Sequence, residues 1–224
     1  MKYTQGRLST TEGTTEGLFD KIREFRDWAE TQAHGSGEWE CGYDGWVEIY
    51  TLFDDFIKTH PFSQWCREHI NEILYIVARD SELGELSNQI AADESLLLFL
   101  SEQALLFGEP DAKWQMANKL SKCGSIEKAE KLLTLYVQDE NEYVNRMALI
   151  ALSLLKSGET EKYCRIAWNR TVYGDMQEYQ RMAVLYSLYN IKSSLLPHYI
   201  ALAIKDGREH LVKKALLIES EIVS

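Results

Sequence analysis

The chain has 224 residues, a net charge of −11 at pH 7, 45% hydrophobic residues and 26% charged residues. This composition is ordinary for a globular protein that buries its own core, and every uninterrupted apolar run, such as residues 96–100, is far below the roughly 20 residues needed to span a bilayer. Because it has only three prolines and is rich in Leu, Ala, Glu and Lys, we expect an almost entirely helical chain.

The N-terminal segment and the cysteines bear on the cellular compartment. Residues 1–13 are polar and contain neither an apolar core nor a small-residue cleavage site, so we predict no secretory signal and a cytoplasmic protein. The four cysteines are scattered without a Cys-x-x-Cys pair, which favours buried free thiols over a zinc site or a disulfide framework. They are Cys41, Cys66, Cys123 and Cys164.

All of the net charge lies in the first part of the chain. Residues 1–100 contain 19 acidic and 8 basic side chains, whereas residues 101–224 contain 16 of each. A negative field repels nucleic acid phosphates and attracts basic proteins. We therefore expect a basic protein partner, and neither nucleic acid nor a membrane.

Apolar residues at three- to four-residue spacing predict three helices in the first 80 residues. The first spans 15–32. The second follows Asp44, a suitable N-cap, and ends before Pro61. The third spans 61–80, and Asp80 is expected to cap the helix after it.

From residue 81 onward the pattern predicts short helices joined by short connections, many of which contain glycine. Glycine is favourable at a helix end because it adopts the left-handed conformation without steric cost. The predicted helices are 82–91, 94–107, 111–120, 126–137, 143–156, 159–172, 178–191, 196–204 and 208–222, and the expected glycine caps are Gly108, Gly124, Gly158, Gly174 and Gly207.

A Met-Ala dipeptide recurs in the C-terminal half of the chain. Its alanines are Ala117, Ala148 and Ala183, with a weaker echo at Ala215, so the period is 31, 35 and 32 residues. Periods of this length are typical of helical-hairpin arrays. A small alanine allows two helices to approach closely while leucines fill the layer between hairpins, so each unit completes its core only by stacking.

Two of these motifs, read with their flanks, align closely: Glu142-Tyr-Val-Asn-Arg-Met-Ala-Leu-Ile-Ala-Leu and Glu178-Tyr-Gln-Arg-Met-Ala-Val-Leu-Tyr-Ser-Leu. The first resembles the short bacterial form of the HEAT-like repeat family, Asp-x-x-x-x-Val-Arg-x-x-Ala-x-x-Ala-Leu. The residues that fit this pattern, with shifted spacing, are Asp139, Val144, Arg146, Ala148, Ala151 and Leu152. Tetratricopeptide repeats have a similar period and rank second, because the chain lacks their Trp, Leu-Gly, Tyr, Ala and Pro pattern.

The resemblance covers residues 109–224 by motif and 61–108 by helix pattern alone. It implies an all-α fold, a right-handed α-α superhelix in which helical hairpins stack into a HEAT-like solenoid. Residues 1–60 would form an acidic, aromatic-rich helical capping region, and residues 61–224 the repeat array of one continuous domain.

Residues 27–57 contain eight carboxylates and several aromatic rings but no Lys or Arg. Trp and Tyr anchor protein interfaces while carboxylates attract Arg and Lys, so the segment predicts a docking surface for a basic protein. The alternative is that the rings cover the first layer of the array and the acids are solvated around them. The candidate contacts are Glu38, Trp39, Glu40, Tyr43, Asp44 and Trp46.

A second candidate surface lies on 126–137, 159–172 and 196–204, which we expect to be the second helices of hairpins. In HEAT-like arrays the second helices usually line the concave face, and here they combine cations with aromatic rings. This composition suits a protein partner more than a polyanion, although a solvated, self-paired helix face is the alternative. The candidate contacts are Arg165, Trp168 and Tyr199.

Motifs for phosphate loops, dinucleotide binding, nucleophile elbows and histidine metal sites are not found in the sequence. We predict no cofactor, no metal and no catalytic residue. The leading hypothesis is a non-enzymatic solenoid that sequesters or scaffolds a basic protein, because small HEAT-like proteins often resemble bacterial toxin-immunity proteins. An adaptor or assembly chaperone stays open.

Two enzymes are the alternatives that the resemblance allows. A HEAT-like DNA alkylation-repair glycosylase needs a basic groove with aromatic rings and a catalytic carboxylate, whereas this array is neutral overall. A phycobilin-lyase-like enzyme needs a chromophore pocket, to which no residue points.

Overall fold

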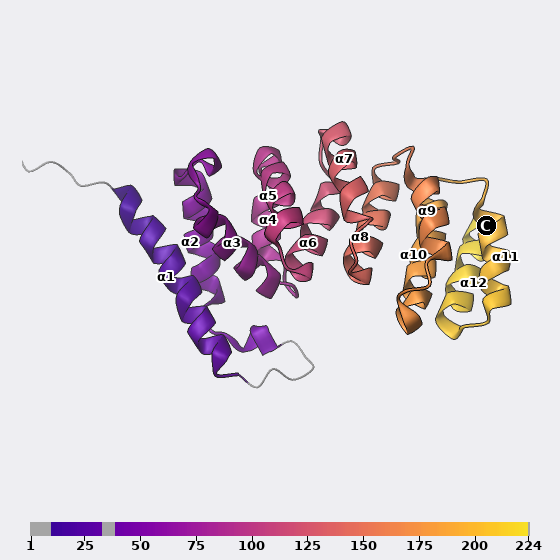
Figure 1. The fold of residues 1–224 in the computed structure, drawn as a ribbon, viewed down its shortest axis with the longest axis horizontal. Coiled ribbons are helices and arrows are strands. Elements are labelled where there is room, and N and C mark those ends of the chain that lie inside the picture. Colours follow the sequence, from indigo (N-terminus) through magenta and orange to yellow (C-terminus); the bar gives the residue numbers. More distant parts are fainter. Residues whose placement is uncertain (1–9, 33–38, 224) are drawn as a thin grey trace, which may run out of the picture.

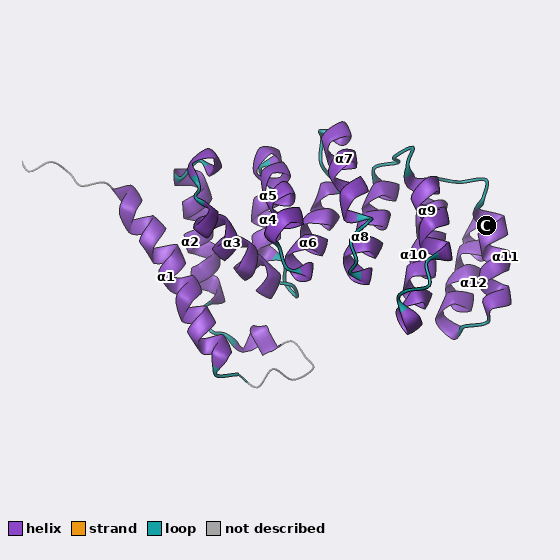
Figure 2. Cartoon of the chain, in the orientation of Figure 1, coloured by secondary structure: helices purple, strands orange, loops and turns teal. Residues whose placement is uncertain are grey.

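The computed structural model describes residues 10–32 and 39–223. In this part of the chain there are twelve α-helices, three short 3-10 helices and no strand, which confirms the predicted all-α class (Figure 2). No helix in the described ranges combines the length and the apolarity that crossing a bilayer requires.

From α3 onward the helices follow one another through short connections (Figure 1). Their bounds are α1 (Thr10–Glu30), α2 (Trp46–Thr59), α3 (Arg67–Arg79), α4 (Glu85–Ala91), α5 (Glu94–Phe107), α6 (Pro110–Leu120), α7 (Ile126–Tyr136), α8 (Glu142–Leu154), α9 (Thr160–Asn169), α10 (Gln177–Asn190), α11 (Leu196–Asp206) and α12 (Glu209–Val223), with 3-10 turns η1 (Trp39–Gly42), η2 (Phe62–Gln64) and η3 (Gly174–Met176).

The predicted start of the third helix is wrong. Pro61 opens the 3-10 turn η2 and Trp65 is extended, so α3 begins only at Arg67. The Trp65 indole explains the break: its Nε1 donates a 3.0 Å hydrogen bond to the carbonyl of His60, and its ring packs 5.1 Å from that of Phe56. Burying this ring stabilises the extended backbone against helix continuation.

Asp80 caps α4 as predicted, but from a greater distance along the chain. The N-cap position is Gly84, in the left-handed conformation, and the Asp80 carboxylate accepts a 2.7 Å hydrogen bond from the backbone N–H of Leu86. Its other oxygen accepts a 2.8 Å hydrogen bond from the Tyr50 hydroxyl on α2. Burial raises the pKa of Asp80, and these two donors oppose that shift.

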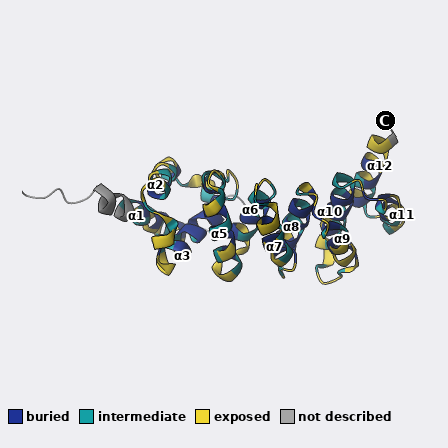
Figure 3. Ribbon diagram, turned by 90° about the horizontal axis from the view of Figure 1, so that it is seen from above, coloured by how far each residue is buried: buried dark blue, intermediate teal, exposed yellow. Residues whose placement is uncertain are grey.

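From α3 onward the helices lie in two rows (Figures 1 and 3). In one row α3, α6, α8, α10 and α12 pack directly against one another, and in the other α5, α7, α9 and α11 each pack mainly against the helix that follows in the chain. The hairpins are therefore α5/α6, α7/α8, α9/α10 and α11/α12. The predicted pairing was out of phase, because 126–137, 159–172 and 196–204 correspond to first helices.

One buried hydrophobic cluster extends from Leu18 on α1 to Ile218 on α12. The alanines of all three Met-Ala motifs are buried, Ala117 and Ala148 within this cluster, but their methionines differ. Met116 is fully buried, whereas Met147 and Met182 are half-buried. The methionine of the motif therefore has equivalent surroundings on α8 and α10, whereas on α6 the motif faces the core differently.

The helix ends differ from the predicted glycine caps. Gly207 has φ 83° at the end of α11, as predicted. Gly108 has φ −74°, and glycine is needed there because an added Cβ would lie 2.7 Å from the carbonyl oxygen of Ala104. The left-handed residues after α8 and α10 are Lys156 and Lys192, both with φ 54°.

Serines in three connections bond to glutamates of the preceding first helix. Ser193 Oγ donates a 2.5 Å hydrogen bond to Glu161 Oε1 on α9, and Ser157 Oγ donates in the same way to Glu130 on α7. Ser125 Oγ likewise donates to Glu94 on α5. Each layer of the array is therefore tied to the next by a hydrogen bond to a carboxylate.

Candidate binding surface

Aromatic residues of the N-terminal region form a closed cluster around Phe25. Trp46 is buried and its Nε1 donates a 2.8 Å hydrogen bond to the carbonyl of Glu40. Trp39 lies stacked 5.8 Å from Trp28, and Tyr43 meets Phe25 edge-on at 5.0 Å. Burial raises the pKa of Tyr43. These rings cover the N-terminal end of the hydrophobic core.

The residues predicted as partner contacts in this region differ in their exposure to solvent. The buried ring of Trp46 belongs to the core and is not available to a partner. Trp39, Glu40 and Tyr43 are half-buried and Asp44 is exposed, so a docking role for these four stays a prediction. Glu38 lies outside the described residues.

Trp39 and Glu40 line a shallow pocket of about 430 Å³ together with Tyr75. The Tyr75 ring is flanked by two guanidiniums, with Arg26 Cζ 3.7 Å and Arg79 Cζ 4.7 Å from its centroid. Both arginines bind carboxylates of the chain, Arg26 at 2.8 Å to Glu72 and Arg79 at 2.8 Å to Glu109. Their charges are thus neutralised within the chain.

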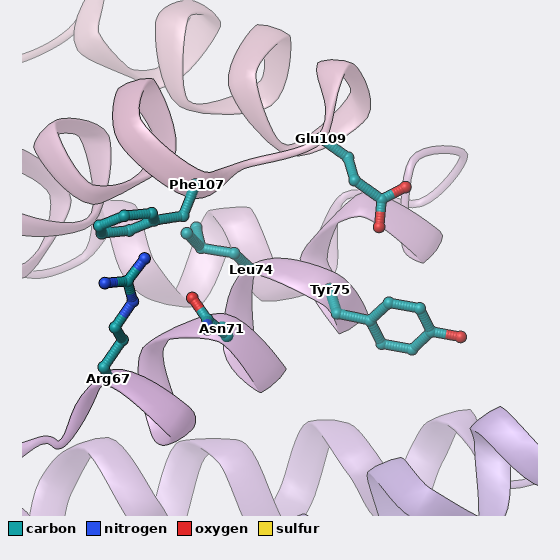
Figure 4. A pocket seen from close by; sticks show the side chains of 6 residues that line it. All are labelled: Arg67, Asn71, Leu74, Tyr75, Phe107 and Glu109. Carbon is teal, nitrogen blue, oxygen red and sulfur yellow. The ribbon is translucent and has the colours of Figure 1, made fainter.

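A second shallow pocket, of about 280 Å³, is also lined by Tyr75. The Arg67 guanidinium stacks 4.1 Å from the centroid of the Phe107 ring at one end, and Tyr75 and Glu109 form the other end (Figure 4). Leu74 and Asn71 lie between them (Figure 4). The pocket is open, and its lining combines one cation, one carboxylate and one amide with apolar and aromatic side chains. No cluster of chemically reactive groups lines it.

The three contacts predicted on the C-terminal half lie on first helices. Trp168 on α9 and Tyr199 on α11 are 6% and 7% exposed, and their rings meet edge-on at 4.9 Å. The Arg181 guanidinium covers Trp168 at 5.0 Å. Trp168 and Tyr199 are therefore core contacts between two layers, and Arg165 alone is exposed.

Another set of residues, which sequence reasoning missed, lies at the entrances to α6, α8 and α10. At each entrance an acidic residue precedes an aromatic residue by three or four positions. We call this set the acid–aromatic ladder; its pairs are Asp111 and Trp114, Glu140 and Tyr143, and Asp175 and Tyr179.

The ladder rings are joined to one another and partly open to solvent. Trp114 meets Tyr143 edge-on at 5.2 Å, and Trp114 Nε1 donates a 3.0 Å hydrogen bond to Asp111. The Arg146 guanidinium lies 4.6 Å from the centroid of Tyr143 and 5.4 Å from that of Tyr179. Tyr143 and Tyr179 are 37% and 39% exposed. The rings are thus held in place without being buried.

The electrostatics around the ladder leave its three carboxylates outside the ion pairs of this row. Four cations of the row pair with other carboxylates of the chain: Arg79 with Glu109, Lys113 with Asp139, Arg146 with Glu142, and Arg181 with Asp206. The three ladder carboxylates are exposed, and within the described ranges none of them is in an ion pair. Burial raises the pKa of Glu142, and Arg146 opposes that shift.

The signal for the ladder is present in the sequence. Acids are favoured at helix N-termini by the helix dipole, so an acid there has an ordinary structural explanation. The aromatic residue three or four positions later has no such explanation at two of the three entrances, because Tyr143 and Tyr179 are not part of the core, whereas Trp114 packs against it. Among the described residues, no group of three or more His, Cys, Asp or Glu side chains is placed to hold a metal ion.

Comparisons with protein-family models, with curated proteins and with solved structures gave no match to this chain.

Proposed function

We propose that the chain is a non-enzymatic, HEAT-like α-solenoid that binds a basic protein along the acid–aromatic ladder. The observation that carries the proposal is that the entrances to α6, α8 and α10 each present one exposed carboxylate, in no ion pair with a described residue, and one partly exposed ring. A toxin-immunity protein, which neutralises a basic toxin, is one form that such a function takes.

The chemistry of the ladder favours a protein with exposed Arg or Lys. Binding energy at interfaces concentrates in Trp, Tyr and Arg residues, and carboxylates around them raise the association rate of a basic partner. Arg146 fixes the two tyrosine rings in the unbound protein, which lowers the entropy lost on binding.

The two rows of helices support a superhelix. Successive helices pack closely along the row α3, α6, α8, α10 and α12, whereas helices of the other row contact one another less. Unequal spacing of two rows curves an array, and in a right-handed α-α superhelix the close row would line the concave face. The ladder would then lie on that face.

Capture of a partner from extracts of the source organism tests this function. The immobilised chain is expected to retain a basic protein at low ionic strength and to release it as salt rises. Tyr143→Ala and Tyr179→Ala should each weaken binding by about 2 kcal/mol, roughly 30-fold, since they remove anchoring rings. Circular dichroism checks that the variants fold.

A matched pair of charge variants separates the ladder from the overall charge. The ladder variant Asp111→Asn/Glu140→Gln/Asp175→Asn should lose binding. The control variant Asp55→Asn/Glu68→Gln/Glu219→Gln removes three exposed charges elsewhere and should retain it. An equal loss of partner binding in both variants would show that only the net charge of the chain matters. Retention of duplex DNA instead of a basic protein would favour the glycosylase alternative.

A further inference from the structure

A groove of about 480 Å³ lies between α5 and α7, which belong to the row of first helices and not to the ladder row. Side chains at positions i, i+4, i+7 and i+8 line it from α5, and side chains at i, i+3, i+4 and i+7 line it from α7. Each wall is thus one face of about two helical turns. The lining residues are Leu98, Glu102, Leu105 and Leu106 on α5, and Lys128, Lys131, Leu132 and Leu135 on α7.

The groove is apolar, and its leucines are incompletely covered. Leu106 is 69% exposed and Leu135 is 55% exposed, while Leu98 and Leu105 are half-buried. Leu132 is buried and forms part of the floor. Single exposed leucines are common on protein surfaces, but a group of them enclosed by charged side chains marks an interaction site.

The two rims of the groove carry opposite charges. Glu102 on α5 and Lys128 on α7 are both exposed, and in the described part of the chain neither is in an ion pair. Lys131 lies 2.9 Å from Glu127 on the same helix, with both side chains more than 70% exposed. Such an exposed pair is weak and can exchange for a partner's carboxylate.

We propose that this groove binds a short amphipathic α-helix of a partner protein. The helix would place a stripe of leucine-like side chains on the groove leucines, a basic residue beside Glu102 and an acidic residue beside Lys128 and Lys131. The straight walls, with a repeat of three to four residues, match the anchor spacing of a docked helix. The required chemistry differs from that of the ladder, which selects a basic surface, so the two sites take different ligands.

Synthetic helical peptides of about 18 residues test the proposal on the full chain. Three dye-labelled peptides share one leucine stripe and differ in their flanks: Lys on one flank and Glu on the other, Lys on both, or Glu on both. A peptide can reverse its direction in the groove, so the informative comparison is between mixed and uniform flanks. Fluorescence anisotropy is expected to show the mixed peptide binding about 2- to 5-fold more tightly than either uniform peptide.

Charge reversal on each rim should redirect this preference. Glu102→Lys is expected to make the peptide with Glu on both flanks the tightest binder, and Lys128→Glu/Lys131→Glu the peptide with Lys on both. Leu106→Ser/Leu135→Ser should weaken all three peptides by about 10-fold or more, because it removes two apolar contacts. Leu216→Ser, at a 50% exposed leucine on α12, is the matched control and should leave binding unchanged.

Several outcomes overturn the proposal. These are no binding of the mixed peptide up to about 1 mM, equal affinity for the three peptides, or preferences unaffected by the rim variants. A concentration-dependent dimer that dissociates in Leu106→Ser/Leu135→Ser would also overturn it, since a second copy of the chain would then occupy the groove.

Discussion

The side-chain amide of Gln180 donates a 2.6 Å hydrogen bond from Nε2 to Asn145 Oδ1 and thereby joins α10 to α8 inside the core. Both residues are almost fully buried. Asn145 in turn donates from Nδ2 to the carbonyl of Val137, and Gln115 makes a similar 2.7 Å bond from α6 to the carbonyl of Val77 on α3. Polar bonds thus fix the relative position of successive layers that leucine packing alone would leave free to slide.

Replacing Gln180 by Leu tests this contribution. The variant leaves the buried Asn145 Oδ1 without its donor, which should destabilise the fold by about 1–3 kcal/mol. Urea unfolding monitored by circular dichroism measures the change. Asn145→Leu/Gln180→Leu should cost less than the two single variants together, and strict additivity would show that the two amides do not interact.

The Ser–Glu bonds between layers give a second prediction. Ser157→Ala and Ser193→Ala should each lower the free energy of unfolding by about 1–2 kcal/mol, because each removes a hydrogen bond to a carboxylate. The effects should add in the double variant, since the two serines lie in different layers. Ser194→Ala, at the exposed neighbouring serine, is the control and should change stability by less than about 0.5 kcal/mol.

The sequence predicts every α-helix of the described chain, and the pairing of helices was the main error. The five-residue connections 121–125 and 137–141 on either side of α7 give no indication of which neighbour completes its hairpin. The two-residue connections 108–109 and 207–208 join helices that pack as hairpins, but the equally short connection 92–93 joins α4 to α5, which packs mainly against α6. Connection length alone therefore does not determine the pairing.

The candidate site was less predictable from the sequence. Trp168 and Tyr199 have the composition of interface anchors, but their rings meet each other between α9 and α11, a contact over 31 residues that helical periodicity does not reveal. Trp65 breaks a helix for a similar reason, since its ring is fixed by Phe56 and His60 on the preceding segment. In both cases tertiary packing overrides local pattern.

Asp206 should make stability depend on pH in the acid range. Hydrogen bonds from Arg208, at 2.6 and 2.8 Å, and the nearby Arg181 lower the pKa of this carboxyl. A lowered folded-state pKa contributes stability that is present above the unfolded-state value of about 3.9 and is lost as the pH falls through the folded-state value.

Asp206→Asn should therefore be less stable than the parent chain by about 1–2 kcal/mol at pH 7. The difference should persist down to about pH 4 and shrink below it, because the parent carboxylate then becomes protonated. Urea unfolding across this range measures both chains. A difference that stayed constant from pH 7 to pH 2 would show that charge at Asp206 does not contribute.

Lys156 and Lys192 hold the left-handed position that follows a helix, where glycine is the most favourable residue. After α8 the N–H of Ser157 bonds to the carbonyl of Leu152, and after α10 the N–H of Ser193 bonds to that of Leu188, so both ends form the same closed turn. A side chain at φ 54° costs about 1 kcal/mol, which the closed turn must offset.

Lys156→Gly and Lys192→Gly should each raise the free energy of unfolding by about 0.5–1 kcal/mol, because the gain in backbone conformation exceeds the added entropy of the unfolded chain. Lys156→Ala keeps the left-handed strain while removing the long side chain, and it should change stability little. The opposite substitution, Gly207→Ala at φ 83°, should destabilise by about 1 kcal/mol. Thermal unfolding of the four variants measures these effects, and a loss of stability in both Lys→Gly variants would mean that the lysine side chains contribute more than the strained backbone costs.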